Sequence, residues 1–435
     1  MTAAPAAAPH LSPDTSNAEI GRRLQPVIIG GDILAYSYVR ELHRAYGIER
    51  TIVLATQDIK MLSSSRFTDY RLIDGIHEAD NLYVALEAVA VEVKESDPDR
   101  VLLVLGCDDC HARMLSGGKE RLEAAGFTVP YIDFPLLDDI TQKRRFYELC
   151  DELDMPYPHT WYFDCGPDGP VELPLTELPF PLIAKPSNSA QFQDATIKGW
   201  RKIYEIESPE ELAQVWQNIR ASDYNNELVV QDFIPGGDDA IRTLTTFSDA
   251  NGDMRVVSGG VVCLQDHDPT ALGNPVCIMG EREEQIIEHA RRFLAHIGYR
   301  GFANFDIKVD ERDGSFRFFE VNTRAGRNTY YMSLGGVNFA TLIVDEFVLG
   351  REIPRCEAYN HFAYSCVPRY VLKRSMENAT RLAEAHSALA ATAEPYPLHY
   401  HPDSFMHNLW ARIMFINQIP KFKRFHWDTG GKQLK

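Results

Sequence analysis

Residues 302–322 read FANFDIKVDERDGSFRFFEVN, and residues 323–327 continue with TRAGR. Two runs in which polar and apolar residues alternate lie on either side of Asp313-Gly314, a pattern that predicts a β-hairpin. Successive side chains of a strand point to opposite faces, so one face collects Asn304, Asp306, Lys308, Glu320 and Asn322. Carboxylate and amide oxygens are suitable ligands for Mg²⁺. This face is therefore a candidate metal site, and a solvated strand face with ordinary charges is the alternative.

The length of the hairpin loop decides whether the two acids share a face. A three-residue loop over 312–314, with Gly314 left-handed, places Asp306 opposite Glu320. A two-residue turn would instead place Asp306 opposite Val321 and put the acids on opposite faces. Two facing carboxylates repel each other unless a cation lies between them. The metal-site interpretation therefore predicts a loop of odd length.

Length and composition indicate a large globular protein that does not bind nucleic acid. The 435 residues predict two or three domains, and 45% hydrophobic with 24% charged residues is ordinary for a soluble protein. The net charge of −18 argues against a nucleic-acid partner, because such proteins usually carry a basic footprint. An acidic small-molecule substrate would need local Lys and Arg.

Targeting and redox signals favour a cytoplasmic location. Residues 1–24 lack a basic start and a continuous apolar core, so they are expected to be a flexible tail and not a secretory signal. No run of 18 or more apolar residues occurs, so no membrane span is expected. The eight cysteines are scattered and resemble reduced thiols. Cys107 and Cys110 have CxxC spacing, which fits either a redox or zinc motif or a strand-end loop with incidental thiols.

Residues 25–138 alternate short apolar strands with helical stretches, as in PVIIGGDILAYSYVRELHRAYG, TIVLATQ and VLLVLGCDD. This alternation predicts an open parallel sheet with helices. Gly30 and Gly31 are only a weak dinucleotide signal, because the full GxGxxG is absent. Ligands of such sheets lie beyond the carboxyl ends of the strands. Gly30, Gly31, Asp32 and residues 107–113 are therefore candidates to line a cleft.

The middle of the chain predicts an α+β body. A helix is expected over 137–153, and Pro156 and Pro158 should end it. A polar loop is expected over 187–199. Strands are expected at 180–184, 202–206, 227–234, 240–247 and 256–264, and helices at 281–297 and 335–349. Such mixed helices and strands are typical of α+β architecture.

Two lysines upstream of the hairpin have contexts that suit a phosphate. Lys143 lies in the first turn of an expected helix, and Lys185 ends an apolar strand before a Ser/Asn-rich loop. An ammonium, loop amides and a helix start all suit a triphosphate, although a lone lysine is more often a solvated surface charge. The order Lys143, Lys185, ELVVQDFIPGGDD, Asp306 and EVN is similar to the order of parts in ATP-grasp enzymes.

This resemblance to the ATP-grasp family covers roughly residues 25–350, and FFEVNTRAGRN is its most specific motif. AKPSNSAQF, DPTALGN and EVNTRAGR are similar to motifs of the carboxylate-amine ligases that include D-aspartate ligase-like enzymes. The resemblance implies an α/β plus α+β fold with ATP between two antiparallel sheets. The implied parts are a tail (1–24), a pre-ATP-grasp parallel-sheet domain (25–138), an ATP-grasp domain (139–350, small lid subdomain about 160–235) and a C-terminal extension (351–435).

The resemblance also implies roles for individual residues. The residues expected at the phosphates are Lys143, Lys185, Ser187 and Ser189. Those expected at the adenine hinge and the ribose are Gln231, Asp232, Ile234 and Asp238, with Asp239 a competing candidate for the ribose. Asp306, Glu320 and Asn322 would carry Mg²⁺, with two ions expected. Arg324 and Arg327 would bind the acyl phosphate or the carboxylates of the substrate.

The phosphate loop and the nucleoside side of the site depart from the family pattern. Many ATP-grasp loops over the phosphates are rich in glycine, whereas residues 187–199 are not. Gln231 and Asp238 stand where many relatives carry Glu. Gln has both a donor and an acceptor for adenine, while Asp238 must reach farther than Glu would.

The implied reaction converts a carboxylate into an acyl phosphate with ATP, after which an amine attacks the acyl carbon and releases phosphate. Positioning and electrostatics would supply most of the catalysis. The substrates would be small molecules, with an amino acid such as D-aspartate and a peptidoglycan-precursor amine as one pair. A dipeptide or natural-product amide ligase is the alternative, and a non-catalytic ATP-binding sensor protein is a second.

The last residues read HNLWARIMFINQIPKFKRFHWDTGGKQLK, in which six Lys and Arg stand against one Asp. This amphipathic, basic segment fits a surface contact with a membrane or a lipid-linked substrate. A docking helix with a solvated tail is the more common alternative. The sequence leaves homo-oligomerisation open.

Overall fold

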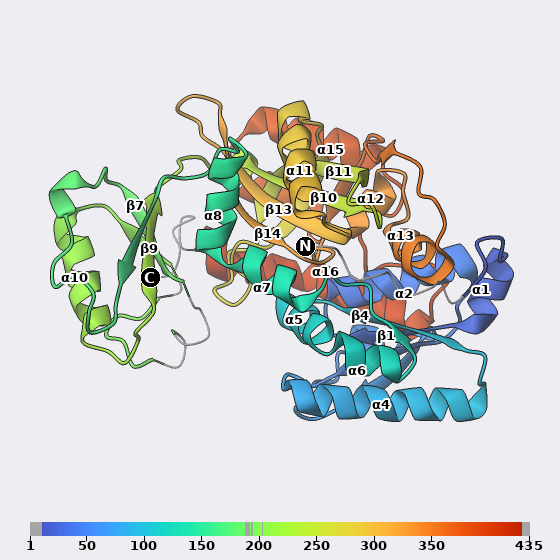
Figure 1. The fold of residues 1–435 in the computed structure, drawn as a ribbon. Helices are drawn as coiled ribbons and strands as arrows, with labels where there is room; N and C mark the ends of the chain where they lie inside the picture. Colours follow the sequence, from blue (N-terminus) through green and yellow to red (C-terminus); the bar gives the residue numbers. More distant parts are fainter. Residues whose placement is uncertain (1–10, 188–191, 193–194, 202, 429–435) are drawn as a thin grey trace. The chain divides into compact units, whose positions relative to one another are not determined.

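The computed structural model describes residues 11–187, 192, 195–201 and 203–428. The chain divides into two compact units. Unit 1 contains residues 1–141, 238–306 and 321–435, and unit 2 contains residues 142–237 and 307–320. Figure 1 labels the helices and strands.

The first part of unit 1 is a five-stranded parallel sheet with the strand order β3-β2-β1-β4-β5. Its strands are β1 (Leu24–Ile29), β2 (Thr51–Ala55), β3 (Thr68–Leu72), β4 (Val101–Gly106) and β5 (Phe127–Thr128). The open parallel sheet expected from the apolar runs is confirmed. In the central pair, Ile28 lies opposite Leu105.

Helices cover both faces of this sheet, which explains its nearly continuous apolar strands. The helices are α1 (Asn17–Arg23), α2 (Ile33–Tyr46), α3 (Lys60–Ser63), α4 (Ala79–Ser96), α5 (Asp109–Gly117), α6 (Lys119–Ala124) and α7 (Phe134–Thr141). Val27 and Ile29 pack in one core with Leu82 and Leu86 of α4, while Ile28 belongs to the core that contains α2. Figure 1 shows α4 and α6 along the same side of β1 and β4.

Part of the expected N-terminal tail is structured. The tail was assigned to residues 1–24, whereas α1 occupies Asn17–Arg23 and the side chain of Ile20 is fully buried. Ser16 caps the helix by accepting a hydrogen bond from the backbone of Glu19. A single buried isoleucine makes no periodic pattern, so the sequence alone did not reveal this docking.

The second part of unit 1 contains a seven-stranded sheet with the order β14-β13-β10-β11-β12-β16, to which β15 adds beside β11. Its strands are β10 (Ile241–Ser248), β11 (Met254–Gln265), β12 (Pro275–Gly280), β13 (Gly301–Val309), β14 (Phe316–Asn322), β15 (Cys356–Glu357) and β16 (Ala363–Ser365). Strands β13 and β14 form the hairpin and run on into unit 2 at its loop end. Because β15 and β16 come from the expected C-terminal extension, that extension shares the sheet that contains the hairpin.

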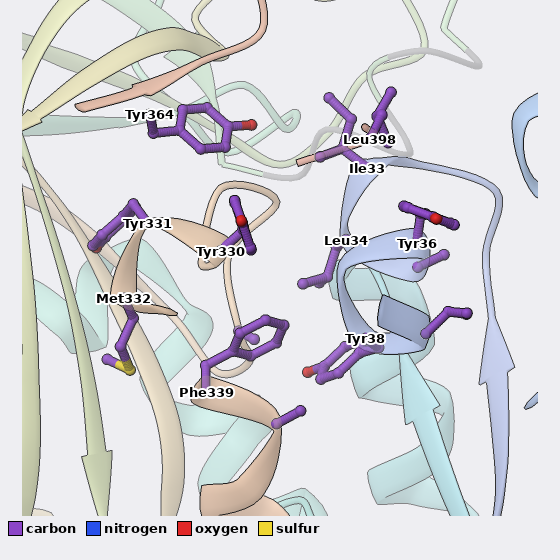
Figure 2. Close-up of a cluster of buried hydrophobic side chains, with 14 of the residues drawn as sticks. Ile33, Leu34, Tyr36, Tyr38, Tyr330, Tyr331, Met332, Phe339, Tyr364 and Leu398 are labelled. Atoms are coloured by element: carbon purple, nitrogen blue, oxygen red, sulfur yellow. The ribbon is translucent and has the colours of Figure 1, made fainter. Parts of the chain in front are cut away.

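The helices of this part are α11 (Glu284–Ile297), α12 (Tyr330–Leu334), α13 (Phe339–Ile343) and the π-helix η3 (Val344–Leu349), and η2 (Asp238–Ala240) precedes β10. They join the first sheet through aromatic packing. Figure 2 shows Leu34 and Tyr38 of α2 pointing toward Phe339 of α13, and the rings of Tyr38 and Phe339 lie 5.0 Å apart. The two sheets of unit 1 therefore share one apolar core.

The C-terminal residues pack on the first sheet region and not only on the second. They form α14 (Arg369–Ser375), α15 (Ala379–Ala391), α16 (Phe405–Phe422) and the π-helix η4 (Lys423–Trp427). The ring of His407 is fully buried, and its two nitrogens lie 2.6 Å from the carbonyl of Met61 and 2.7 Å from that of Leu398. The hydroxyl of Tyr36 donates to Asp403 at 2.7 Å. Helix α16 therefore docks on the rest of unit 1, which was one of the two expectations for this segment.

Unit 2 is a four-stranded antiparallel sheet with the order β6-β9-β7-β8. Its elements are α8 (Lys143–Glu152), β6 (Thr160–Asp164), η1 (Leu175–Glu177), β7 (Leu182–Pro186), β8 (Tyr204–Ile206), α10 (Pro209–Arg220) and β9 (Glu227–Asp232). Trp216 of α10 packs edge-on against Phe163 of β6, so α10 covers one face of the sheet, as Figure 1 shows.

Candidate active site

The hairpin loop is one residue longer than expected. The backbone amide of Asp310 donates to the carbonyl of Ser315 at 2.7 Å, and the amide of Gly314 donates back to Asp310 at 2.8 Å. These bonds enclose the four residues 311–314, so the prediction of an odd-length loop is wrong. Gly314 is left-handed as predicted, with φ of +72°. An α-turn closed by a left-handed glycine uses one residue more than the three-residue loop considered from sequence.

The alternation of β14 is also interrupted. Phe318 and Val321 are both buried although they are three residues apart, and the two residues between them are half-buried. A strict two-residue period would place Phe318 and Val321 on opposite faces. The loop has an even number of residues, and β14 is irregular. That Asp306 and Glu320 face each other therefore stays a prediction.

Two of the three proposed metal ligands meet within unit 1. The side-chain amide of Asn322 donates to the carboxylate of Asp306 at 3.2 Å and approaches the backbone carbonyl of Asn304 at 3.4 Å. Asp306 and Asn322 therefore share a face. The side chain of Asn304 points to β10, where its oxygen accepts a hydrogen bond from Thr245 at 2.7 Å. In the described part of the chain, no group of three or more His, Cys, Asp or Glu side chains could hold a metal ion.

The two proposed phosphate lysines and Glu320 lie in unit 2. The expected helix over 137–153 is divided, and Lys143 is the first residue of α8. Its ammonium lies 3.9 Å from the carboxylate of Glu320, which is about half exposed. A lysine at a helix start faces unfavourable backbone dipoles unless an anion is near. Among the described ion pairs, Lys143 is paired with Glu320 alone.

Lys185 lies on β7 and has no hydrogen bond or ion pair with any residue that the structure describes. Burial, and to a smaller extent the charge of Lys143, together lower the pKa of its ammonium to about 8, while Glu320 acts in the opposite sense. A cation held in such a place is costly without an anionic partner. An anion bound beside Lys185 would offset this cost.

The serines of the proposed phosphate loop are only partly described. The amide of Ser187 donates to the carbonyl of Glu227 at 3.0 Å, and its hydroxyl lies 3.4 Å from that of Tyr224. Ser189 lies outside the described residues.

Gln231, proposed for the adenine hinge, is 1% exposed and already engaged. Its side-chain nitrogen donates to Tyr147 and to Thr160, both at 2.8 Å, and the hydroxyl of Tyr147 donates to the carbonyl of Phe319 at 2.9 Å. This chain of hydrogen bonds ties β9 to α8 and to the hairpin. Tyr147 was not identified from the sequence, since a tyrosine on an amphipathic helix has no distinctive spacing.

The other hinge and ribose candidates differ in how free they are. Ile234 is 4% exposed, and Asp232 has one buried oxygen without a hydrogen bond, so that burial raises the pKa of its carboxyl. In unit 1, Asp238 accepts a hydrogen bond from the backbone of Gln265 at 2.8 Å. Asp239, the competing candidate, accepts one from Asn378 at 2.8 Å. Their roles toward a nucleotide stay predictions.

Arg324 and Arg327 lie in unit 1 directly after β14, and only one of them has a partner. The guanidinium of Arg324 binds the carboxylate of Asp109 at 2.6 Å, at the start of α5. Arg327 is half-buried and has no hydrogen bond or ion pair among the described residues. Its charged neighbours include Asp32, and burial raises the pKa of that carboxyl while Arg327 lowers it.

Asp32 and the strand-end loops lie at this same cluster, as the parallel-sheet rule predicted. Asp32 caps α2 by accepting from the backbone of Leu34 at 3.0 Å and of Ala35 at 3.1 Å. Gly30 has φ of +133°, and a Cβ there would lie 2.8 Å from Cβ of Cys107. Only glycine allows the two strand ends to approach this closely.

The loop cysteines form no disulfide. Cys107 is buried and Cys110 is exposed, and both are free thiols. Both interpretations of the CxxC spacing therefore stay predictions.

The sequence did not identify two further neighbours of Arg327. They are Tyr364, which lies in β16, and Cys366, which directly follows that strand. The thiol of Cys366 lies 2.9 Å from the hydroxyl of Tyr364. That hydroxyl donates to the side chain of Asn328 at 3.0 Å. These residues were assigned to the C-terminal extension, for which the sequence had no motif.

No helix among the described residues is long and apolar enough to cross a membrane.

No protein-family model matches the chain. D-aspartate ligase of Enterococcus faecium is 30% identical over 417 residues, which cover 93% of this chain and 97% of that protein. The arginine-specific carbamoyl phosphate synthase large chain of Geobacillus stearothermophilus is 23% identical over 279 residues, 63% of this chain and 25% of that protein.

Solved structures share the fold. The L-amino acid ligase from Bacillus licheniformis has a TM-score of 0.50 and 14% identity, with 74% of each chain covered. The ADP complex of the purK protein, N5-carboxyaminoimidazole ribonucleotide synthetase, has a TM-score of 0.53 and 12% identity, over 78% of this chain and 79% of that one. The biotin carboxylase domain of Hydrogenobacter thermophilus 2-oxoglutarate carboxylase has a TM-score of 0.55 and 16% identity, over 78% and 72%.

Proposed function

Because this chain belongs to the ATP-grasp carboxylate-amine ligases that include D-aspartate ligase, we propose that it joins D-aspartate to an amine of a peptidoglycan precursor. ATP would activate the carboxylate, and ADP and phosphate would be released. The similarity to D-aspartate ligase extends over nearly the full length of both chains. It therefore includes the region around Arg327 as well as the nucleotide-binding motifs.

The observation that carries the proposal is the unpaired guanidinium of Arg327. A half-buried cation without an acceptor in the described chain favours a carboxylate ligand, which guanidinium can bind through two parallel hydrogen bonds. An amino acid with two carboxylates suits this site, because one carboxylate can bind the arginine while the other reacts. Arg324 is already held by Asp109 and would bind the second carboxylate or the acyl phosphate.

The residues fit ATP and Mg²⁺. Lys185 is a desolvated cation without a partner in the described chain, and Lys143 starts a helix beside it in the same unit, so both suit phosphate oxygens. Asp306, Glu320 and Asn322 offer the hard oxygen ligands that Mg²⁺ prefers. When bound, Mg²⁺ would neutralise charge on the phosphates during transfer. Gln231, Asp232, Ile234, Asp238, Ser187 and Ser189 are proposed for the nucleoside and phosphate contacts.

The chemistry then needs no covalent enzyme nucleophile. A substrate carboxylate oxygen attacks the terminal phosphorus of ATP, and the bond to ADP breaks. The amine nitrogen attacks the acyl carbon, loses a proton, and phosphate leaves with the former carboxylate oxygen. The lysines and arginines hold the reacting groups in place and stabilise developing negative charge.

Release of ADP in an amino-acid screen tests the proposal. We expect release with D-aspartate plus a peptidoglycan precursor that carries a free amine, and little release when either is omitted. Arg327→Lys should raise the KM for the amino acid about tenfold or more, since one ammonium cannot replace a planar fork. Arg355→Lys, on an exposed residue, is the matched control.

Other outcomes of the screen would contradict the proposal. Release with two free amino acids and none with the precursor would favour a dipeptide or natural-product ligase. Binding of ATP with no release under any pair would favour a sensor protein.

The affinity for ATP should weaken as pH rises through about 8. The folded protein lowers the pKa of Lys185 from its usual value of 10.5 to about 8, so this lysine is charged at pH 7 and mostly neutral at pH 9. Loss of the charge removes a phosphate partner. Lys185→Arg stays protonated throughout and should flatten the profile between pH 7 and 9. Calorimetric titration with ATP measures this, and the same slope in both proteins would contradict the role of Lys185.

A further inference from the structure

Helix α16 has an outward face that no described residue covers. Its exposed apolar side chains are Phe405 (81% exposed), Met406 (49%), Leu409 (39%) and Ile416 (59%). Positions 405, 409 and 416 fall on one side of a helix, opposite the buried His407 and Ala411. The helix has 18 residues and is about 27 Å long. The exposed Arg412 lies on the same side between Leu409 and Ile416. A face that gathers several large apolar side chains is unlike the isolated apolar side chains of an ordinary surface.

An apolar groove adjoins this face. Its walls come from α16 and from the residues that precede it, namely Glu394, Pro395, Tyr396, His399, Arg412, Phe415 and Ile416, and its volume is about 300 Å³. The rings of Tyr396 and Phe415 lie 4.6 Å apart at its wall. Ile416 belongs to both the groove and the outward face, so the two form one apolar surface.

A cluster of cations lies at the C-terminal end of this surface, which we call the basic cluster. It consists of Arg369, Lys373 and Arg374 of α14 and Lys423 and Arg424 of η4, all of them exposed. Trp427 connects the two elements, because Arg374 lies over its ring at 4.6 Å and Tyr370 packs against its edge at 5.9 Å. None of the five cations forms an ion pair with a residue that the structure describes.

Charge in this region is opposite to that of the whole protein. Residues 369–428 carry eight Lys and Arg against five Asp and Glu, whereas the full chain has a net charge of −18. Most surface arginines elsewhere have an acidic partner, as Arg121 has in Glu87 at 2.6 Å. Unpaired cations beside exposed aromatic and aliphatic side chains are the features of helices that lie in the interface of an anionic membrane.

We propose that α16 and the basic cluster together bind the surface of an anionic lipid bilayer. The apolar face would enter the boundary between headgroups and acyl chains, while the five cations would meet lipid phosphates. This requires no membrane span. It would hold a chain of high negative charge at a negatively charged surface through this basic region.

A second copy of the chain is the other occupant that an apolar face could take. A two-fold dimer places the same patch of both subunits together. Each subunit would bring the same basic cluster, so the dimer would supply no acidic partner for these cations. Charge complementarity therefore favours the lipid surface.

Co-sedimentation of the full-length protein with vesicles tests the proposal. Vesicles of phosphatidylglycerol and phosphatidylcholine should bind at least tenfold more protein than pure phosphatidylcholine, and added salt should reduce the difference. The variant Phe405→Ser/Leu409→Ser/Ile416→Ser and the variant Lys423→Glu/Arg424→Glu should each lower binding about tenfold or more.

Matched controls separate this surface from general stickiness or charge. Val84→Ser/Val91→Ser removes two exposed apolar side chains of α4, which are 60% and 57% exposed, and should leave binding unchanged. Arg22→Glu/Arg201→Glu makes the same change of charge at exposed cations elsewhere, again with no loss expected. Circular dichroism melting curves check that every variant folds.

Three results would overturn the proposal. The first is equal binding of wild type to charged and neutral vesicles, or no binding. The second is loss of binding in the control variants to the same extent. The third is a wild-type dimer in sedimentation velocity that the triple α16 variant abolishes, without any vesicle binding, which would assign the face to a second copy.

Discussion

Glu320→Gln should lower the rate of ADP release on the order of 10²- to 10³-fold, about 3 to 4 kcal/mol of transition-state stabilisation. The change keeps the size of the side chain and removes its negative charge. Glutamine is a weaker ligand for Mg²⁺, and it also leaves the ammonium of Lys143, 3.9 Å away, without its acid. The effect should fall mainly on kcat, because charge develops on the phosphates during transfer.

Glu311→Gln is the matched control, since Glu311 is an exposed acid in the loop of the same hairpin. It should change the rate less than about twofold, as exposed charges contribute little. Titration with Mg²⁺ adds a second readout, in which Glu320→Gln should require several-fold more metal. An unchanged rate in Glu320→Gln would remove the metal assignment.

Arg40→Met should destabilise unit 1 by about 3 to 5 kcal/mol, the cost of breaking a buried ion pair from one side. Arg40 lies on α2, and its side chain is completely buried. Its guanidinium donates to the carbonyl of Pro397 at 2.8 Å and of His399 at 3.2 Å, and binds Glu394 at 2.9 Å. It therefore anchors the chain segment that leads into α16.

The substitution also leaves the buried carboxylate of Glu41 with Arg44, 3.6 Å away, as its one partner among the described ion pairs. Both carboxylate oxygens of Glu41 lack a hydrogen-bond partner in the described structure, and Arg40 Nε lies 3.3 Å away. Arg40→Met/Glu41→Leu should thus recover part of the loss, because it removes a buried carboxylate that has lost its nearer cation. Arg50→Met, which breaks the exposed pair with Asp69 at 3.1 Å, should cost less than about 1 kcal/mol.

Urea unfolding followed by circular dichroism measures these differences. A loss in Arg40→Met no larger than in Arg50→Met would mean that the buried contacts of Arg40 contribute little. If the double variant were as unstable as the single one, the weaker pairing of Glu41 would not be the source of the loss.

Local patterns were sufficient for the parts of the fold whose contacts are close in sequence. The apolar runs at β1, β2 and β4 predicted the parallel sheet, and the alternation around Asp313-Gly314 predicted the hairpin. The parallel-sheet rule also placed Asp32 among the candidates that line the strand ends, where it has Arg327 as a charged neighbour. These features follow from periodicity, which a chain carries in every short window.

Patterns failed where hydrogen bonds or strand pairing that no periodicity encodes decided the outcome. The loop has four residues because the amide of Gly314 reaches back to Asp310, a choice that Asp313-Gly314 alone leaves open. Residues 363–365 became β16 by pairing with β12, with no motif to predict it. Gln231 was available to adenine by its chemistry, yet its amide nitrogen is held by Tyr147 and Thr160.

By itself, the sequence determined the parallel sheet, the hairpin and the family motifs, including the residue types that ATP, Mg²⁺ and a carboxylate would need. Only the tertiary structure decided which of those residues have partners. It left Lys185 and Arg327 without a partner among the described residues, bound Arg324 to Asp109, and gathered five unpaired cations beside α16. The physical reason is that charge and residue type are local, whereas desolvation and pairing depend on atoms that folding brings from hundreds of residues away.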